Sequence, residues 1–251
     1  MIILGIDTAT AAASVALVED GRSIAEEFQS SSEKSSTGTV AQSRGNHAEI
    51  VLPLIQSVIT TARVAVADLS GIAVSIGPGS FTGLRVGLAT AKGIAYECGL
   101  PLVGVSTLHA NAARVPNFDG MICSLLDARK NDVYFALFRR DGEDLKRLTE
   151  DAMSSIDGAL DQLRNSNPAP RSSLFFIGDG ARAYEKFITR DLAGSGQIFA
   201  GKGNSSMAVQ VARLAEGRFR AHKTDDVALL APVYLRPTQA ETKRIEYAVT
   251  C

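Results

Sequence analysis

An internal repeat is the strongest constraint on how this chain of 251 residues folds. Apolar segments, tight turns and glycine corners recur in the same order in both halves, and the first three matches share an offset of 120 residues (127 minus 7). This agreement of strand, turn and corner favours duplication over coincidence. We therefore expect two lobes of one topology. The matched pairs are Met1-Ile2 with Met121-Ile122, Asp7 with Asp127, Ala16-Leu17 with Ala136-Leu137, Asp20-Gly21 with Asp141-Gly142, and Ile76-Gly77-Pro78-Gly79 with Ile177-Gly178-Asp179-Gly180.

The first half shows what one lobe contains. Asp20-Gly21 between apolar runs is a strong hairpin signal, because a type I′ turn needs positive φ at both central positions. Three antiparallel strands, then a helix, a strand, a helix and a strand give an α/β lobe like ribonuclease H. The expected strands span 2–6, 14–18, 24–28, 72–76 and 102–105, and the expected helices span 47–62 and 82–98.

The second half supports a division into a first lobe (1–106), a second lobe (107–204) and a C-terminal helix and tail (205–251) that could pack across the lobes. We expect a helix over 154–163, a strand over 174–177 and a last helix over 205–220. The segment 30–46 is rich in Ser, Thr and Gly without apolar periodicity, which predicts a loop.

Composition limits the class of partner. The 45% apolar content, 21% charged content and net charge of −1 are those of an ordinary globular protein and do not favour a self-contained RNA-binding module. Three cysteines without a Cys-x-x-Cys pair argue against a disulfide framework and a zinc ribbon. No run approaches the ~20 apolar residues that span a bilayer, so we expect a cytoplasmic protein without a membrane partner.

The segment Gly77-Pro78-Gly79-Ser80-Phe81-Thr82-Gly83-Leu84-Arg85 is a glycine-rich corner between a strand and a helix. Such a corner can cradle phosphate with backbone N–H groups. It lacks the Gly-Lys-Ser/Thr ending of a P-loop, and its serine does not stand in Gly-x-Ser-x-Gly. A tight turn that only allows strand and helix to pack is the plain alternative.

The helix after this corner carries Gly83, Gly87, Ala91 and Ala95 at every fourth position. A Gly inside a helix costs ~0.8–1.0 kcal/mol of helix stability relative to Ala. The glycines of this ridge must therefore be present for a reason other than helix formation. Close packing of a second helix, from this chain or another, is that reason. On this interpretation Leu at positions 87 and 91 blocks partner binding and leaves the fold intact.

Asp7-Thr8, at the end of the first strand, resembles the Asp that holds Mg-phosphate in two-lobed kinases, and Asp127 repeats it. These three residues are a candidate vestigial nucleotide site, although a strand-end Asp is more often a local cap. His47 opens a helix, and a metal pair on one helix face needs a ligand at 50 or 51, where Ile50 and Val51 stand. We expect no metal site.

Taken together, these motifs resemble the bacterial TsaB (YeaZ-type) proteins over nearly the whole chain. The nine-residue corner is the most specific part of the resemblance. The other parts are Ile3 to Thr10, Ser14-Val15-Ala16-Leu17, His47 with Leu52-Pro53, Gly104-Val105-Ser106-Thr107-Leu108, Asp127-Ala128-Arg129 with Val133-Tyr134, and Pro232-Val233-Tyr234-Leu235-Arg236.

The resemblance implies the two-lobed actin, Hsp70 and sugar-kinase fold and a non-catalytic subunit. Its catalytic relative, TsaD, carries a His-x-x-x-His metal motif and transfers threonylcarbamoyl to N6 of adenosine 37 in tRNAs reading codons that begin with A. Here His47 is followed by Val51, so that motif is missing. A small-molecule kinase or a peptidase-like enzyme of the same superfamily is the alternative function.

The resemblance further implies binding to a TsaD-like subunit through the first lobe. A TsaE-like ATPase would join, tRNA would be bound through the complex, and the assembled complex, not this chain alone, would use ATP. Alone, the chain would form a homodimer. The expected partner interface comprises Gly77, Pro78, Gly79, Ser80, Phe81, Thr82, Gly83, Arg85, Gly87, Ala91 and His47. The Ser-rich segment 30–45 is longer than usual for the family.

Overall fold

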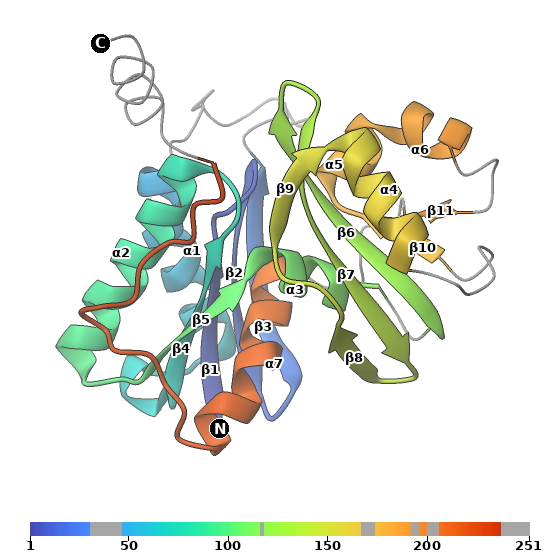
Figure 1. Cartoon of the computed structure of the whole chain (residues 1–251). Helices are drawn as coiled ribbons and strands as arrows, with labels where there is room; N and C mark the ends of the chain where they lie inside the picture. The colour runs from blue at the N-terminus through green and yellow to red at the C-terminus, as the bar shows by residue number, and fades with distance from the viewer. Residues whose placement is uncertain (31–46, 116–117, 167–173, 192–195, 200–205, 237–251) are drawn as a thin grey trace, which may run out of the picture.

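The computed structural model describes residues 1–30, 47–115, 118–166, 174–191, 196–199 and 206–236. Residues 31–46 of the loop predicted over 30–46 lie outside these ranges, and Ser30 is the last residue of a strand. Two mixed sheets stand side by side, each with helices on its outer face (Figure 1).

The first sheet has the strand order β3-β2-β1-β4-β5. Its first three strands are antiparallel, and β4 and β5 run parallel to β1. Both faces of β1 are covered, since all its residues after Ile2 are buried. The strands are β1 (Ile2–Asp7), β2 (Ala12–Glu19), β3 (Arg22–Ser30), β4 (Gly71–Gly77) and β5 (Leu102–Ser106).

The second sheet repeats this order. Read from its other edge it is β8-β7-β6-β10-β11, so β6 takes the place of β1 and β10 that of β4. The predicted duplication and the predicted α/β fold class are therefore confirmed. Strand β9 (Ala152–Ser155) is an addition that pairs with β7. The other strands are β6 (Gly120–Arg129), β7 (Asp132–Asp141), β8 (Asp144–Arg147), β10 (Leu174–Ile177) and β11 (Gln197–Ile198).

Helices α1 (His47–Ala62) and α2 (Phe81–Cys98) cover the outer face of the first sheet, where Leu4, Val15 and Val74 join their core. Helix α4 (Ile156–Ser166) covers the outer face of the second sheet. Both helices predicted for the first lobe are confirmed, and Pro53 lies inside α1. The short helices α5 (Asp179–Ala183) and α6 (Glu185–Asp191) follow β10.

Two helices cross between the lobes. Helix α3 (Thr107–Ala113) follows the first sheet but buries Leu108 and Ala112 against the second. Helix α7 (Met207–Arg220) follows the second sheet but packs on the first, so closely that a Cβ atom at Gly5 would lie 2.2 Å from the Ala208 carbonyl oxygen. This exchange brings α3 and α7 into contact with each other between the two sheets.

After α7 the described chain continues in an extended segment. Residues 221–236, here called the C-terminal strap, run alongside α2 (red in Figure 1). The strap is fixed by Asp225, whose N–H donates to the Leu102 carbonyl, and by Val233, whose N–H donates to the Ile76 carbonyl at 2.7 Å. Within the described ranges, no helix is long and apolar enough to cross a membrane.

Candidate functional site

The glycine corner is shaped by contacts within the chain. Gly77 has φ of 118°, a conformation that favours glycine, and a Cβ atom there would lie 2.5 Å from the carbonyl oxygen of Val233 in the strap. Ser80 caps α2, because its Oγ accepts from the Gly83 N–H at 3.2 Å. The corner therefore brings strand, helix and strap together.

The turn after β1 occupies the place where a phosphate would approach. The Ser80 N–H donates to the Ala9 carbonyl at 2.7 Å, and the Thr8 hydroxyl donates to the Gly83 carbonyl at 2.7 Å. A Cβ atom at Gly79 would lie 2.3 Å from the Ala9 carbonyl oxygen. The N–H groups of Ser80 and Gly83 are thus already used inside the chain.

The small-residue ridge of α2 needs a correction. Gly83, Gly87, Ala91 and Ala95 are all buried. A Cβ atom at Gly83 would lie 2.0 Å from the Thr8 carbonyl oxygen, and one at Gly87 would lie 2.2 Å from the Thr8 hydroxyl. Gly83 and Gly87 lack side chains because this chain's own Thr8 packs on them, and Ala91 lies in the core of the first lobe. The expectation that Leu at positions 87 and 91 would leave the fold intact is therefore wrong.

The predicted interface residues divide accordingly. Gly77, Pro78, Gly83, Gly87 and Ala91 are buried, whereas the exposed members lie at the start of α2. These exposed members are Ser80, Phe81, Thr82 and Arg85, and Gly79 and His47 are half-buried. The interface as a whole stays a prediction. Of its predicted members, only the exposed and half-buried residues are open to a partner.

The exposed face of α2 continues well beyond the corner. Ala89 and Gly93 are exposed, and a Cβ atom at Gly93 would meet nothing within 4 Å. Tyr96 follows with 83% of its surface exposed, and Leu229 of the strap with 79%. We call Phe81, Arg85, Ala89, Gly93 and Tyr96 the α2 face. Sequence reasoning missed its last three members because the buried ridge carried the stronger pattern.

Asp7 and Thr8, from the candidate nucleotide site, lie in the interior. Asp7 is 1% exposed, and Ser75 donates its hydroxyl to the carboxylate at 2.6 Å. Burial raises the pKa of Asp7, while the hydrogen bonds from Ser75 and Ala9 and the charges of Arg114 and His47 act against that rise. Neither the Asp7 carboxylate nor the Thr8 hydroxyl is accessible to a ligand in this conformation.

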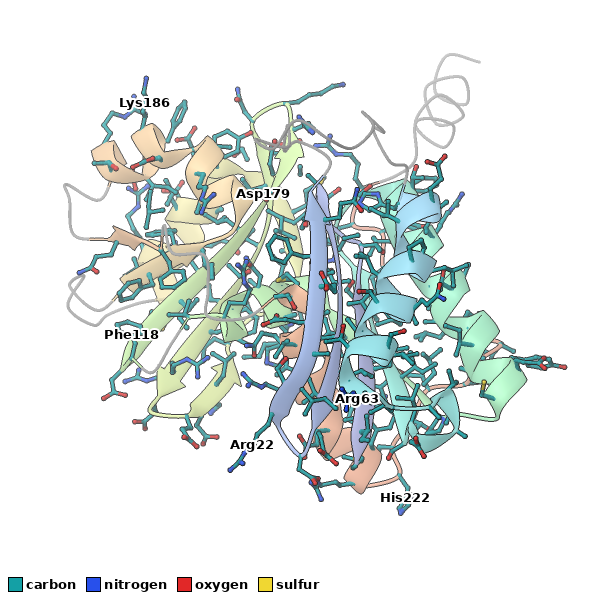
Figure 2. The ribbon with its side chains drawn as sticks, turned by 180° about the vertical axis from the view of Figure 1, so that it is seen from behind. Arg22, Arg63, Phe118, Asp179, Lys186 and His222 are labelled. Atoms are coloured by element: carbon teal, nitrogen blue, oxygen red, sulfur yellow. The ribbon has the colours of Figure 1, made fainter. Side chains whose placement is uncertain are left out.

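Asp127, at the matching place in the second lobe, is less enclosed. Its Oδ1 accepts from the Arg129 N–H at 2.8 Å and from the Tyr184 hydroxyl at 3.3 Å. Asp179, which Figure 2 shows toward the upper end of the second lobe, accepts from the Asp127 N–H at 3.0 Å. These contacts are those of a local turn, and nucleotide binding at Asp127 stays a prediction.

His47 opens α1 as predicted, with Val51 buried one turn later. Its Nε2 is buried and has no hydrogen-bond partner within the described part of the chain. Across the same residues, no three His, Cys, Asp or Glu side chains are grouped as metal ligands would be.

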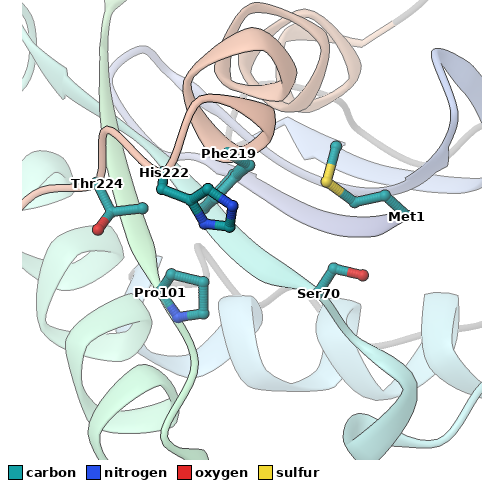
Figure 3. Close-up of a pocket in the computed structure, with 6 residues that line it drawn as sticks. All are labelled: Met1, Ser70, Pro101, Phe219, His222 and Thr224. Atoms are coloured by element: carbon teal, nitrogen blue, oxygen red, sulfur yellow. The ribbon is translucent and has the colours of Figure 1, made fainter.

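A separate hollow of about 390 Å³ lies at the opposite end of the first sheet (Figure 3). None of its lining residues is among the predicted site residues. The sticks in Figure 3 show Met1, Ser70, Pro101, Phe219, His222 and Thr224 around its rim.

Comparison with known proteins decides the family. A family model described as TsaD, tRNA N6-adenosine threonylcarbamoyltransferase, matches residues 23–244. The tRNA threonylcarbamoyladenosine biosynthesis protein TsaB of Bacillus subtilis (strain 168) is 30% identical over 246 residues, which cover 98% of this chain and 99% of that protein. The chain belongs to the TsaB family. The predicted resemblance is confirmed.

Solved structures agree on the fold of this TsaB-family chain. A Pseudomonas aeruginosa protein, described as similar to peptidase YEAZ, superposes with a TM-score of 0.73 and 23% identity over 94% of this chain and 99% of its own. The ROK hexokinase of Thermus thermophilus reaches a TM-score of 0.50 with 10% identity, over 88% of this chain and 100% of its own. The fold is the two-lobed one of actin-like proteins and sugar kinases.

Proposed function

We propose that this TsaB-family chain is a non-catalytic, cytoplasmic scaffold subunit for threonylcarbamoyl transfer to N6 of adenosine 37 in tRNAs reading codons that begin with A. It acts by binding a TsaD-like catalytic paralogue. A TsaE-like ATPase joins the assembly, which uses ATP and holds the tRNA.

The observation that carries this proposal is the exposed α2 face beside a fully packed corner. A catalytic subunit of this fold needs reactive groups that reach a ligand, whereas the Asp7 carboxylate and the Thr8 hydroxyl are used inside the chain. On α2, Phe81 and Tyr96 expose aromatic side chains, a residue class enriched in protein interfaces. A binding role therefore fits better than an enzymatic one.

The same face supports a homodimer when the paralogue is missing. In an antiparallel pair of α2 helices related by a two-fold axis at Ala89, Arg85 of one copy lies opposite Gly93 of the other, where a side chain finds open space. An interface of this kind serves either partner, and we propose that the catalytic paralogue competes with self-association.

Substitution of an exposed glycine tests the proposal. Gly93→Arg adds a long charged side chain to the α2 face without touching the fold, because nothing lies within 4 Å of the new Cβ. We expect it to abolish co-purification with the TsaD-like subunit. Gly217→Arg is the matched control, since Gly217 is also an exposed helix glycine with open space around its Cβ, but on α7.

Equal co-purification of wild-type and Gly93→Arg protein would place the interface elsewhere. Failure of the wild-type chain to bind the subunit at all, in the presence of the TsaE-like ATPase and tRNA, would contradict the scaffold function itself.

A further inference from the structure

Arg85 on the α2 face is held in a fixed position by two aromatic rings. Its guanidinium carbon lies 3.8 Å from the centroid of the Phe81 ring and 5.7 Å from that of Tyr234. Its Nε donates to the Tyr234 hydroxyl at 2.9 Å. Only one of the five guanidinium N–H groups is used in that bond, so the two Nη nitrogens still carry four donors.

Tyr234 is itself anchored on both sides. The preceding residue, Val233, is bonded to Ile76 and packs against the side-chain-free Gly77. Two residues further along, Arg236 forms an ion pair with Asp132 of the second lobe. The Tyr234 and Phe81 rings lie 4.9 Å apart between these anchors and the start of α2. The strap therefore positions the ring that positions Arg85.

The charge of Arg85 is not neutralised within the described ranges. Arg147, Arg164 and Arg218 each pair with an aspartate there, but Arg85 forms no ion pair. The first turn of α2 also contains no acidic residue. Arg85 thus combines an ordered side chain with an uncompensated charge, and arginine is among the residue types enriched at interface hot spots.

The surroundings indicate which anion the guanidinium receives. A surface that follows nucleic-acid phosphates is basic, whereas Ala89, Gly93 and Tyr96 follow Arg85 along the α2 face. The nearest other cation on this helix, Lys92, donates its ammonium to the strap carbonyls of Ala228 and Leu230. A single fork of donors among small and aromatic side chains matches one carboxylate of a protein.

We propose that Arg85 is the charged anchor of the α2 face and receives a carboxylate of an Asp or Glu side chain from the TsaD-like subunit. Phe81 and Tyr234 are positioning residues for it. This inference rests on the proposed function, since it names the chemistry of the partner at that surface.

The test measures the dissociation constant between the full chain and the TsaD-like subunit. Arg85→Met, which keeps the length but removes the charge and the donors, is expected to raise Kd at least about 30-fold. Arg85→Lys keeps the charge but loses the forked pair of donors, so its Kd is expected to lie between those of wild type and Arg85→Met. The matched control is Arg190→Met, because Arg190 also lies over an aromatic ring, that of Phe187 at 5.3 Å, but on α6.

A double-mutant cycle tests the positioning role. Tyr234→Phe removes only the hydroxyl that holds Nε, so it should weaken binding less than Arg85→Met and should have no further effect when combined with it. Equal melting temperatures of the four proteins would show that folding is unchanged. Additive effects of the two substitutions would overturn the positioning role.

Three results separate the possible failures. Arg85→Met binding within about 3-fold of wild type would overturn the anchor and leave the scaffold function standing. Unchanged subunit binding with weaker tRNA binding by the assembled complex would assign Arg85 to a phosphate and also overturn the proposal. No binding by the wild-type chain would refute the proposed function and, with it, the anchor.

Discussion

The two glycine corners of this molecule are duplicates that have been put to different uses. Gly77 after β4 has φ of 118°, and Gly178 after β10 has φ of 116°. In the first lobe the corner leads into α2, with 18 residues, and is covered by the strap. In the second it leads into α5, with five residues, and is covered by the Leu125 carbonyl of β6.

This difference shows which part of a duplicated lobe is free to change. The backbone of the corner is kept, because each corner places a glycine with positive φ between its strand and its helix. The helix that follows is not constrained in the same way. The longer helix, α2, carries the exposed face that we propose for the partner, and behind it Thr8 and Asp7 are hydrogen-bonded inside the chain.

The largest expected effect comes from adding a methyl group at each corner. At Gly178, a Cβ atom would lie 1.9 Å from the Leu125 carbonyl oxygen in the middle of the second sheet, so Gly178→Ala should lower the free energy of unfolding by about 3 kcal/mol or more. At Gly77 the nearest obstacle, the Val233 carbonyl oxygen of the strap, lies farther away at 2.5 Å, so Gly77→Ala should cost less, about 2 kcal/mol. Urea unfolding of both variants measures the difference.

The control for this pair is Gly142→Ala. Gly142 also has positive φ, at 58°, but a Cβ atom there would meet nothing within 4 Å, so it isolates the backbone strain. If Gly77→Ala proved as costly as Gly178→Ala, the strap would be as rigid as the sheet, and the contrast between the corners would be lost.

A smaller effect is expected from the hydroxyl that closes the first corner. Thr8→Val keeps the shape but leaves the buried Gly83 carbonyl without the Thr8 donor, so it should cost about 1–3 kcal/mol. The second lobe has Ala128 after Asp127 and so has no such hydroxyl to lose. Thermal unfolding measures the effect, and a neutral Thr8→Val would mean that the first corner is closed by packing alone.

The buried strand-end aspartate of the first lobe, Asp7, should make stability depend on pH. Burial raises the folded-state pKa of Asp7 above its ordinary 3.8, so the folded state holds this proton more tightly than the unfolded state. The associated stability is present below the unfolded pKa and is lost as pH rises through the folded pKa. Asp7→Asn does not titrate and avoids that loss.

The melting temperature of Asp7→Asn relative to that of wild type should therefore rise between pH 4 and pH 7. Arg114 and His47, whose charges face Asp7, remain in both proteins. Ser75→Ala removes a hydrogen bond that lowers the pKa of Asp7. This variant should therefore lose more stability than wild type as the pH rises. A constant difference between Asp7→Asn and wild type would contradict the raised pKa.

Features fixed by interactions between residues near in sequence could be predicted, whereas features fixed by contacts between distant parts of the chain could not. Local patterns were sufficient for β1, α1, α2 and β10, and the repeat was sufficient for the shared topology. The sequence suggested that the C-terminal helix packs across the lobes, but it did not predict that α3 crosses in exchange, because that depends on which sheet each helix meets in space. The ridge of α2 was assigned to a partner for the same reason: small residues signal a close approach, but their spacing does not say that Thr8 makes it.

The smallest expected effect concerns the part of α2 that α5 lacks. Gly93 is an exposed helix-interior glycine without a contact that requires it, so Gly93→Ala should raise the free energy of unfolding by ~0.8–1.0 kcal/mol. Gly217→Ala on α7 should gain the same amount, and chemical unfolding measures both. If both variants gain stability but only Gly93→Ala weakens binding of the TsaD-like subunit, then the missing side chain at Gly93 serves to let the partner approach α2 closely. A loss of stability in Gly93→Ala would instead show that this glycine serves the fold, as Gly83 and Gly87 do.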